Sequence, residues 1–192
     1  QLTSVDGPRT DMSDTLTLTY YANEAGQGNN RGQLHTVTNP LGQTTTYSNY
    51  TPVGKPGTIT DAAGLVTTLT YTFKGAVLTR TTGGLTTSYG YDDAGRIQTI
   101  TLPGSRILSY TYTGDLVTAI TDGLGNRINY TYDAKGQRTG EEIHDPANAL
   151  TYTLSQSYDA AGNLSKRIYP GNAEETYGYD AVHNLMQTID PT

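Results

Sequence analysis

Short runs of alternating polar and apolar residues, separated by glycine-containing turns, make up most of this chain. In the segment 106–112, Leu108, Tyr110 and Tyr112 would lie on one face of an extended strand, with the intervening residues on the other face. Helical periodicity is nearly absent. The best helical candidate, residues 140–150, contains Asp145-Pro146, so we expect a longer loop there. The pattern predicts an all-β chain.

A tyrosine followed four residues later by a glycine recurs along the chain. From Tyr50 onward, successive tyrosines of the repeat lie 21, 20, 21, 20, 26 and 21 residues apart. A period near 20 residues indicates a repeat architecture, in which each unit buries its apolar face only against its neighbours. The complete copies are Tyr50/Gly54, Tyr71/Gly75, Tyr91/Gly95, Tyr132/Gly136 and Tyr158/Gly162.

Other copies of the repeat are imperfect. The copy at Tyr112 is two residues shorter, and the copy at Tyr179 has His183 where the others have glycine. An older copy is expected at Gly32-Gln33-Leu34, after a polar insertion that follows Tyr21. We expect one array over residues 1–192, with 1–31 as a degenerate first unit and about seven to eight hairpins. Because the chain starts at Gln1 and stops within a repeat at 190–192, we expect it to be part of a larger protein.

One repeat unit has the length of one β-hairpin. After the turn 92–95, residues 96–102 can form an outgoing strand, 103–105 a second turn, and 106–112 a return strand. The outgoing strands carry apolar pairs three residues apart, which strict alternation would put on opposite faces, so we expect a β-bulge or a strong twist within each pair. These pairs are Leu34/Val37, Ile97/Ile100 and Val117/Ile120. Tandem antiparallel hairpins of about 21 residues, with this feature repeated at every period, predict one curved sheet.

The motif residues are expected to have structural roles. Aspartate favours turns by bonding its own backbone, and glycine adopts a positive φ without strain. The tyrosines of successive hairpins should form ladders on one face of the sheet. These turn and ladder positions are Tyr91, Asp92, Gly95, Tyr112, Tyr132, Asp133, Gly136, Tyr158, Asp159, Gly162, Tyr179 and Asp180.

Composition narrows the possible partners. Of 192 residues, 34% are hydrophobic and 16% charged, with 16 tyrosines and no tryptophan, which suits a broad sheet with modest burial. The net charge of −6 argues against nucleic-acid binding, which needs a basic face. No run approaches the roughly 20 apolar residues of a membrane helix, so we expect no membrane insertion. The chain has no cysteine, which excludes disulfides and cysteine-bound zinc.

Few residues suggest chemistry. His35, His144 and His183 lie in different repeats without a shared spacing, which favours exposed strand or turn positions over a metal site. The acidic turns at 92–93 and 122 lack the alternating oxygen ligands of a calcium loop. The adjacent Glu141 and Glu142 would point to opposite faces of a strand. We therefore expect no enzyme activity, no cofactor and no catalytic, ligand-binding or metal residues.

The iterated Tyr-Asp-x-x-Gly-[Asn/Arg/Gln]-[Leu/Ile] pattern, with its Asp/Pro-x-x-Gly linker turns, resembles the RHS/YD-repeat family from about Gly32 onward. This family includes shells of bacterial polymorphic toxins, the B and C components of insecticidal toxin complexes, and teneurins. The resemblance implies a sheet that spirals into a hollow shell, enclosing a cytotoxic segment in the toxins. The chain would form an arc of such a β-spiral shell. Toxin members end in an Asp-Pro-x-Gly core motif that Asp190-Pro191-Thr192 only begins, so no protease residues are assigned.

Two functions follow as hypotheses. The first is a secreted or cell-surface container, bacterial by resemblance, whose partners are the rest of the parent polypeptide, an enclosed toxin domain, or further copies bound through sheet edges. The second is an adhesion or carbohydrate-binding module with a glycan as partner. A tyrosine lining on an enclosed face favours the container, and aromatic rings exposed on a convex face favour glycan binding.

Overall fold

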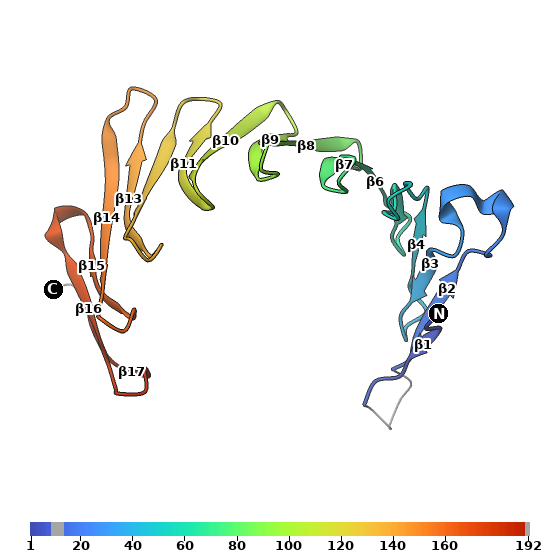
Figure 1. Cartoon of the computed structure of the whole chain (residues 1–192), viewed down its shortest axis with the longest axis horizontal. Coiled ribbons are helices and arrows are strands. Elements are labelled where there is room, and N and C mark those ends of the chain that lie inside the picture. The colour runs from blue at the N-terminus through green and yellow to red at the C-terminus, as the bar shows by residue number, and fades with distance from the viewer. Residues whose placement is uncertain (9–13, 191–192) are drawn as a thin grey trace. The chain divides into compact units, whose positions relative to one another are not determined.

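The computed structural model describes residues 1–8 and 14–190. Over these residues the chain forms 17 β-strands in one open sheet, and successive strands lie side by side in Figure 1. The strand pairs are antiparallel. The predicted all-β sheet of antiparallel hairpins is confirmed. Pro191 and Thr192, where a core motif would begin, lie outside the described residues.

The chain divides into two compact units. The first comprises Gln1–Gly90 with Thr101–Gly104, and the second Tyr91–Ile100 with Ser105–Thr192. The first unit holds β1 (Ser4–Val5), β2 (Leu16–Tyr20), β3 (Leu34–Thr38), β4 (Thr44–Ser48), β5 (Thr58–Thr60), β6 (Val66–Tyr71) and β7 (Val77–Thr82). Strands β8 (Leu85–Tyr91) and β9 (Ile97–Leu102) have residues in both units.

The second unit continues the same hairpin pattern. Its strands are β10 (Arg106–Thr113), β11 (Leu116–Asp122), β12 (Arg127–Tyr132), β13 (Arg138–His144), β14 (Leu150–Tyr158), β15 (Leu164–Ile168), β16 (Glu174–Tyr179) and β17 (Leu185–Ile189). Only two short 3₁₀ segments, η1 (Ala25–Asn30) and η2 (Pro170–Asn172), interrupt the strands of the described chain. The insertion after Tyr21 forms η1.

Of the two predicted alternatives, a β-bulge or a strong twist, the structure shows a β-bulge at two of the three apolar pairs. Opposite Thr19 and Tyr20, the partners on β3 are Thr36 and Leu34, so one extra residue falls between Leu34 and Val37. Opposite Thr111 and Tyr112, the partners on β11 are Ala119 and Val117, so the extra residue falls between Val117 and Ile120.

Four more hairpins have the same irregularity immediately before the motif tyrosine. The extra residue bends the outgoing strand locally and strengthens its twist.

The prediction of a longer loop at 140–150 is wrong. Strand β13 continues to His144, a tight turn spans Asp145–Ala149, and β14 starts at Leu150. In this turn Asn148 adopts the positive φ, 64°, that glycine supplies elsewhere. The 26-residue spacing therefore arises because β13 and β14 have seven and nine residues, whereas β15 and β16 of the following 21-residue copy have five and six.

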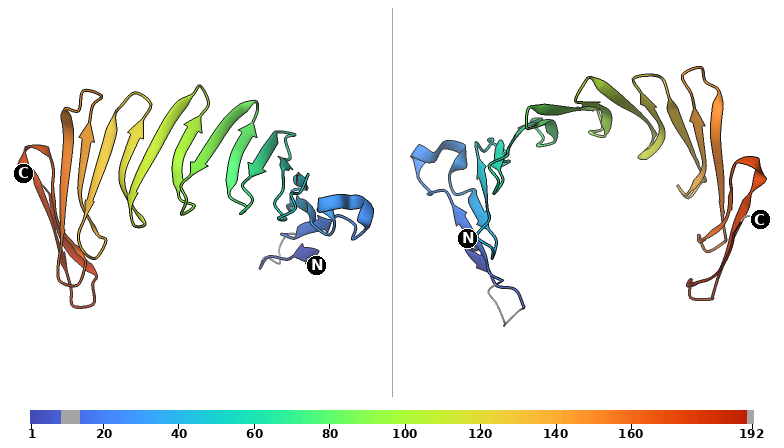
Figure 2. Two further views of the ribbon diagram at one scale, coloured as in Figure 1. Left: turned by 45° about the horizontal axis from the view of Figure 1, so that its top comes forward. Right: turned by 180° about the vertical axis from the view of Figure 1, so that it is seen from behind.

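The sheet is a single layer with little full burial. In the part of the chain that the structure describes, Tyr50 is the one hydrophobic residue classed as buried, with 7% of its surface exposed. The insertion carrying η1 contacts this residue, since Asn30 Oδ1 accepts the Tyr50 backbone N–H at 2.9 Å. Figure 2 shows the strands of each unit as one layer. Both faces of the sheet are consequently available for contacts.

Candidate functional site

The motif turns share one hydrogen-bond pattern. In the turn at Asp92, the Asp92 N–H donates to Arg96 O at 2.9 Å and the Gly95 N–H donates to Asp92 O at 2.9 Å. The Asp92 carboxylate accepts the Arg96 N–H at 2.9 Å. The same backbone pattern closes the turns at 133, 159 and 180.

The aspartate carboxylates bind their own turns, as expected. Backbone N–H groups of Gln137, Asn163 and Asn184 donate to Asp133, Asp159 and Asp180, each at 2.9 Å. A side-chain hydrogen bond from Arg96 lowers the pKa of Asp92. The side chains of Asn163 and Asn184 likewise lower the pKa of Asp159 and of Asp180. Each carboxylate is thus occupied by local donors.

The turn glycines have the predicted conformation. Gly95, Gly136 and Gly162 have φ values of 85°, 80° and 93°. Where the glycine is missing, His183 takes the position with a φ of 67°. Histidine is among the residues that tolerate this region, though at some cost.

The motif tyrosines link neighbouring hairpins. The Tyr132 hydroxyl donates to Val117 O at 2.7 Å, and Val117 is the residue beside the bulge in the preceding hairpin. The Tyr158 hydroxyl donates to Arg138 O at 2.8 Å, again beside a bulge. Equivalent bonds join Tyr50 to Leu34 and Tyr112 to Ile97. Hydroxyl–carbonyl bonds therefore join successive hairpins at the motif tyrosines.

The two faces of the sheet differ in chemistry. Within each unit, we call one face the tyrosine face. It carries the motif tyrosines and the side chains two residues away from them along the same strand. In the second unit this face pairs Tyr110 with Ile120 and Ile128 with Ile143. On the opposite face, which we call the hydroxyl face, threonine hydroxyls bond in cross-strand pairs such as Thr19–Thr36 at 2.6 Å and Thr70–Thr79 at 2.6 Å.

The residue after the turn glycine reaches the next turn along the sheet edge. Gln137 Nε2 donates to Gly162 O at 2.9 Å, and the Arg96 guanidinium donates to Gly114 O. Asn163 Nδ2 lies 3.0 Å from Nδ1 of His183. We call these contacts rim tethers. They give a physical reason for Asn, Arg or Gln after the glycine in the motif.

The tyrosine face of the second unit also carries charged side chains. Arg138 lies 3.0 Å from the Glu141 carboxylate and 5.4 Å from the centre of the Tyr130 ring. Further along, the Tyr169 hydroxyl donates to Glu175 at 2.7 Å. Burial raises the pKa of Tyr177, next to this pair, to about 12. This face combines apolar surface with paired charges.

The residues considered for chemistry do not converge. Glu141 contacts Arg138, whereas Glu142 contacts His144 at 3.2 Å. His35 stacks on Tyr21, with ring centres 4.3 Å apart. Residues 1–8 and 14–190 contain no group of three or more His, Asp or Glu side chains that could hold a metal ion.

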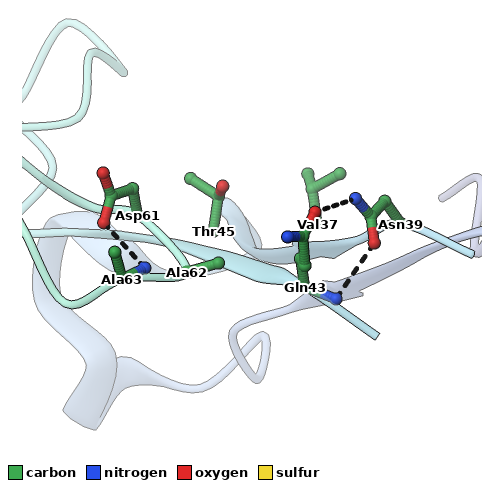
Figure 3. Close-up of a pocket in the computed structure, with 7 residues that line it drawn as sticks. All are labelled: Val37, Asn39, Gln43, Thr45, Asp61, Ala62 and Ala63. Carbon is green, nitrogen blue, oxygen red and sulfur yellow. Dashed lines mark hydrogen bonds between the residues drawn. The ribbon is translucent and has the colours of Figure 1, made fainter. Parts of the chain in front are cut away.

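One open depression lies on the first unit, beside β3 and β4 (Figure 3). Its volume is about 390 Å³, and Val37 and Thr45 form part of it. The polar groups around it are used by turns: Ala63 N–H donates to Asp61 Oδ1 at 2.9 Å, and Gln43 N–H donates to Asn39 Oδ1 at 2.9 Å. The depression is concave, but the polar groups around it do not converge as catalytic groups would.

None of the helical segments in residues 1–8 and 14–190 has the length and apolar character of a membrane-spanning helix.

Sequence reasoning missed the partners of the rim tethers and of the tyrosine hydroxyls. The signal for the tethers was present, because the position after the turn glycine is restricted to Asn, Arg or Gln in several copies. The tyrosine acceptor is a backbone carbonyl, which has no sequence signal beyond the apolar pair at the bulge.

Comparison with known proteins gives family matches over most of the chain. A family model described as "Teneurin YD-shell" matches residues 8–149, and one described as "RHS Repeat" matches residues 158–192. No curated protein matches the chain.

The chain resembles parts of much larger solved structures. A TcdB2-TccC3-Cdc42 crystal structure is 20% identical with a TM-score of 0.81, over 98% of this chain and 11% of that chain. TcdB2-TccC3 without its hypervariable C-terminal region gives the same values. A Tc holotoxin pore from Photorhabdus luminescens is 17% identical with a TM-score of 0.62, over 93% of this chain and 12% of that chain. These similarities show the fold, and the chain spans about a ninth of those proteins.

Proposed function

The chain belongs to the teneurin YD-shell family, and from this premise we propose that it is a wall segment of a hollow shell that encloses or presents another polypeptide, such as a C-terminal toxin. Its role in this proposal is structural and not catalytic. We further propose that residues 1–192 form one repeat array, that the parent protein is secreted or on the cell surface, and that it is bacterial.

The observation that carries this proposal is the chemical difference between the two faces of a single-layer sheet. The hydroxyl face satisfies its own polar groups through cross-strand threonine pairs. The tyrosine face presents half-buried aromatic and aliphatic side chains that no second layer of the described chain covers. A large uncovered apolar face is unusual in a soluble protein and marks a contact surface. Enclosure within a shell would remove this face from bulk water.

The similar solved structures support this proposal. Their titles name TcdB2-TccC3 assemblies, and one of them names a hypervariable C-terminal region. The depression at β3 and β4 does not favour an enzyme, because its carboxylate and amides bond their own turns.

Cysteine labelling tests which face is enclosed. The chain has no cysteine, so single cysteines can be placed without background. Thr45 and Thr46 are adjacent on β4: Thr45 pairs with Val37 on the tyrosine face, and Thr46 pairs with Thr36 on the hydroxyl face. We expect Thr45→Cys in the intact parent protein to react with a bulky maleimide at least about tenfold more slowly than the matched Thr46→Cys, because a closed wall excludes the reagent.

After denaturation both cysteines should react equally. Equal rates in the native protein would contradict enclosure. Faster labelling of Thr45→Cys would favour a tyrosine face open to solvent and hence the glycan-binding alternative, in which added oligosaccharide should slow that labelling.

A further inference from the structure

The turn between β16 and β17 departs from the other motif turns in one residue. His183 stands where the complete copies have glycine, and it holds a φ of 67°. Its own N–H still closes the turn by donating to Asp180 O at 3.1 Å. The histidine therefore keeps the turn geometry and adds an imidazole at the rim of the sheet.

This imidazole is the acceptor of a rim tether. Asn163 Nδ2 lies 3.0 Å from His183 Nδ1 and also donates to Asp159 Oδ2 at 2.9 Å. An amide nitrogen can only donate, so Nδ1 of His183 must offer a lone pair. That requires a neutral ring with its proton on Nε2.

The asparagine cannot adapt to a protonated ring without loss. Rotating its amide would turn Oδ1 toward the histidine, but it would also place an acceptor oxygen against the Asp159 carboxylate. Both orientations of Asn163 therefore lose one hydrogen bond when His183 Nδ1 carries a proton.

We propose that the Asn163–His183 contact is a pH-sensitive tether that holds the turn 180–184 against the turn 159–163 while His183 is neutral and releases it in mildly acidic solution. A free imidazole changes its charge near pH 6.5, so a fall in pH within the physiological range is sufficient to protonate one. This inference goes beyond the proposed shell function and does not depend on what a shell encloses.

The carboxylates of Asp159 and Asp180 are the acidic groups of the two turns that the tether joins. The opposing cation is Lys135, whose Nζ lies 3.5 Å from Ala160 O on the same turn. Tyr158 and Tyr179 immediately precede the two turns.

The other rim tethers provide an internal comparison. Gln137 and Arg96 donate to the backbone carbonyls of Gly162 and Gly114, which do not titrate. The contact between turns 159–163 and 180–184 should therefore respond to pH. The contact between turns 133–137 and 159–163 should not.

Amide hydrogen exchange of the whole chain tests the tether. Between about pH 7.5 and pH 5.5, after correction for the intrinsic pH dependence, exchange of the paired amides of β16 and β17 should speed up about two- to tenfold, the effect of losing one hydrogen bond. Amides of β10 and β11, which contain no histidine and are joined by the turn that accepts the Arg96 tether, should not change by this factor.

Two variants separate the tether from general acid effects. His183→Asn keeps a residue that tolerates positive φ, as Asn148 and Asn172 do here, but it does not titrate, so its exchange in β16 and β17 should not respond to pH. Asn163→Ala should show at neutral pH the faster exchange that the natural chain shows in acid. An equal pH response in His183→Asn and the natural chain, or no response in the natural chain, would overturn the proposal.

Discussion

At the residue scale, the repeated tyrosine and aspartate act through bonds to backbone groups. Tyr132 and Tyr158 each donate to a carbonyl beside a bulge in the preceding hairpin. Asp133 and Asp159 each accept from amides of their own turn. Because these acceptors and donors are already used within the fold, we propose that the copies are building elements and not ligand sites.

The tyrosine hydroxyl should have a measurable share in stability. Tyr132→Phe keeps the ring and removes the donor to Val117 O, so we expect it to lower the free energy of unfolding by about 0.5–1.5 kcal/mol in urea denaturation. Tyr110→Phe is the matched control on the same face, since its hydroxyl makes no hydrogen bond within the described ranges 1–8 and 14–190. Equal effects of the two substitutions would refute a specific role for the hydroxyl–carbonyl bond.

The turn carboxylates should respond to acid and not to calcium. The pKa of Asp159 is lowered because Asn163 donates a side-chain hydrogen bond to it. A carboxyl whose pKa is lower in the folded chain stabilises the fold above its unfolded pKa, and this stability is lost as the pH falls through the folded pKa. Asp159→Ala should therefore lower the melting temperature near neutral pH, with the difference shrinking below about pH 4. Stabilisation of the natural chain by millimolar calcium, abolished in this variant, would instead make the turn a binding site.

At the scale of single elements, the sequence predicts most of each hairpin. Alternation, the turn residues and the apolar pair at 117 and 120 were sufficient to place the strands and the bulge. The turn at Asp145–Ala149 cannot be predicted from the glycine pattern, because Asn148 replaces the turn glycine and Asp145-Pro146 is typical of a loop. The rim tethers could not be predicted, because Gln137 and Gly162 are 25 residues apart and meet only once the hairpins are stacked.

The turn glycines should be required because they adopt a positive φ, and not because an added side chain would lack room. At Gly136, with a φ of 80°, an added Cβ would meet Leu116 at 3.8 Å, which is an ordinary contact. Gly136→Val should therefore cost about 1 kcal/mol or more through backbone strain alone. Gly136→Asn should cost clearly less, as asparagine holds a positive φ at 148 and 172. Equal losses in thermal unfolding would show that positive φ is not the constraint.

At the scale of the whole molecule, a sheet of stacked hairpins needs its neighbours. All five residues of β17 are exposed, including Leu185, Met186 and Ile189, and the strand is paired with β16 along one side. Strand β1 has only two residues, so it offers a shorter edge for pairing than the five residues of β17. An uncharged, apolar strand edge is a template for pairing with another strand.

The isolated chain should therefore self-associate through β17. Light scattering should show a mass that rises with protein concentration, and the double substitution Met186→Lys and Ile189→Lys should reduce this rise, because charges on an edge strand oppose pairing. Leu41→Lys, at an exposed turn residue away from β17, is the control and should leave the association unchanged. A monomer at every concentration would contradict the prediction.

We propose that this chain forms a wall whose tyrosine face is turned toward an enclosed polypeptide. The most direct measurement is a cryo-EM map of the intact parent protein, in which the hairpins of residues 14–190 can be located. We expect the tyrosine face, with Tyr110, Tyr132 and Leu154, to line a closed interior, and the hydroxyl face, with Thr111 and Thr131, to face solvent. A tyrosine face exposed on the outside of the particle, with the threonine pairs lining the interior, would contradict it.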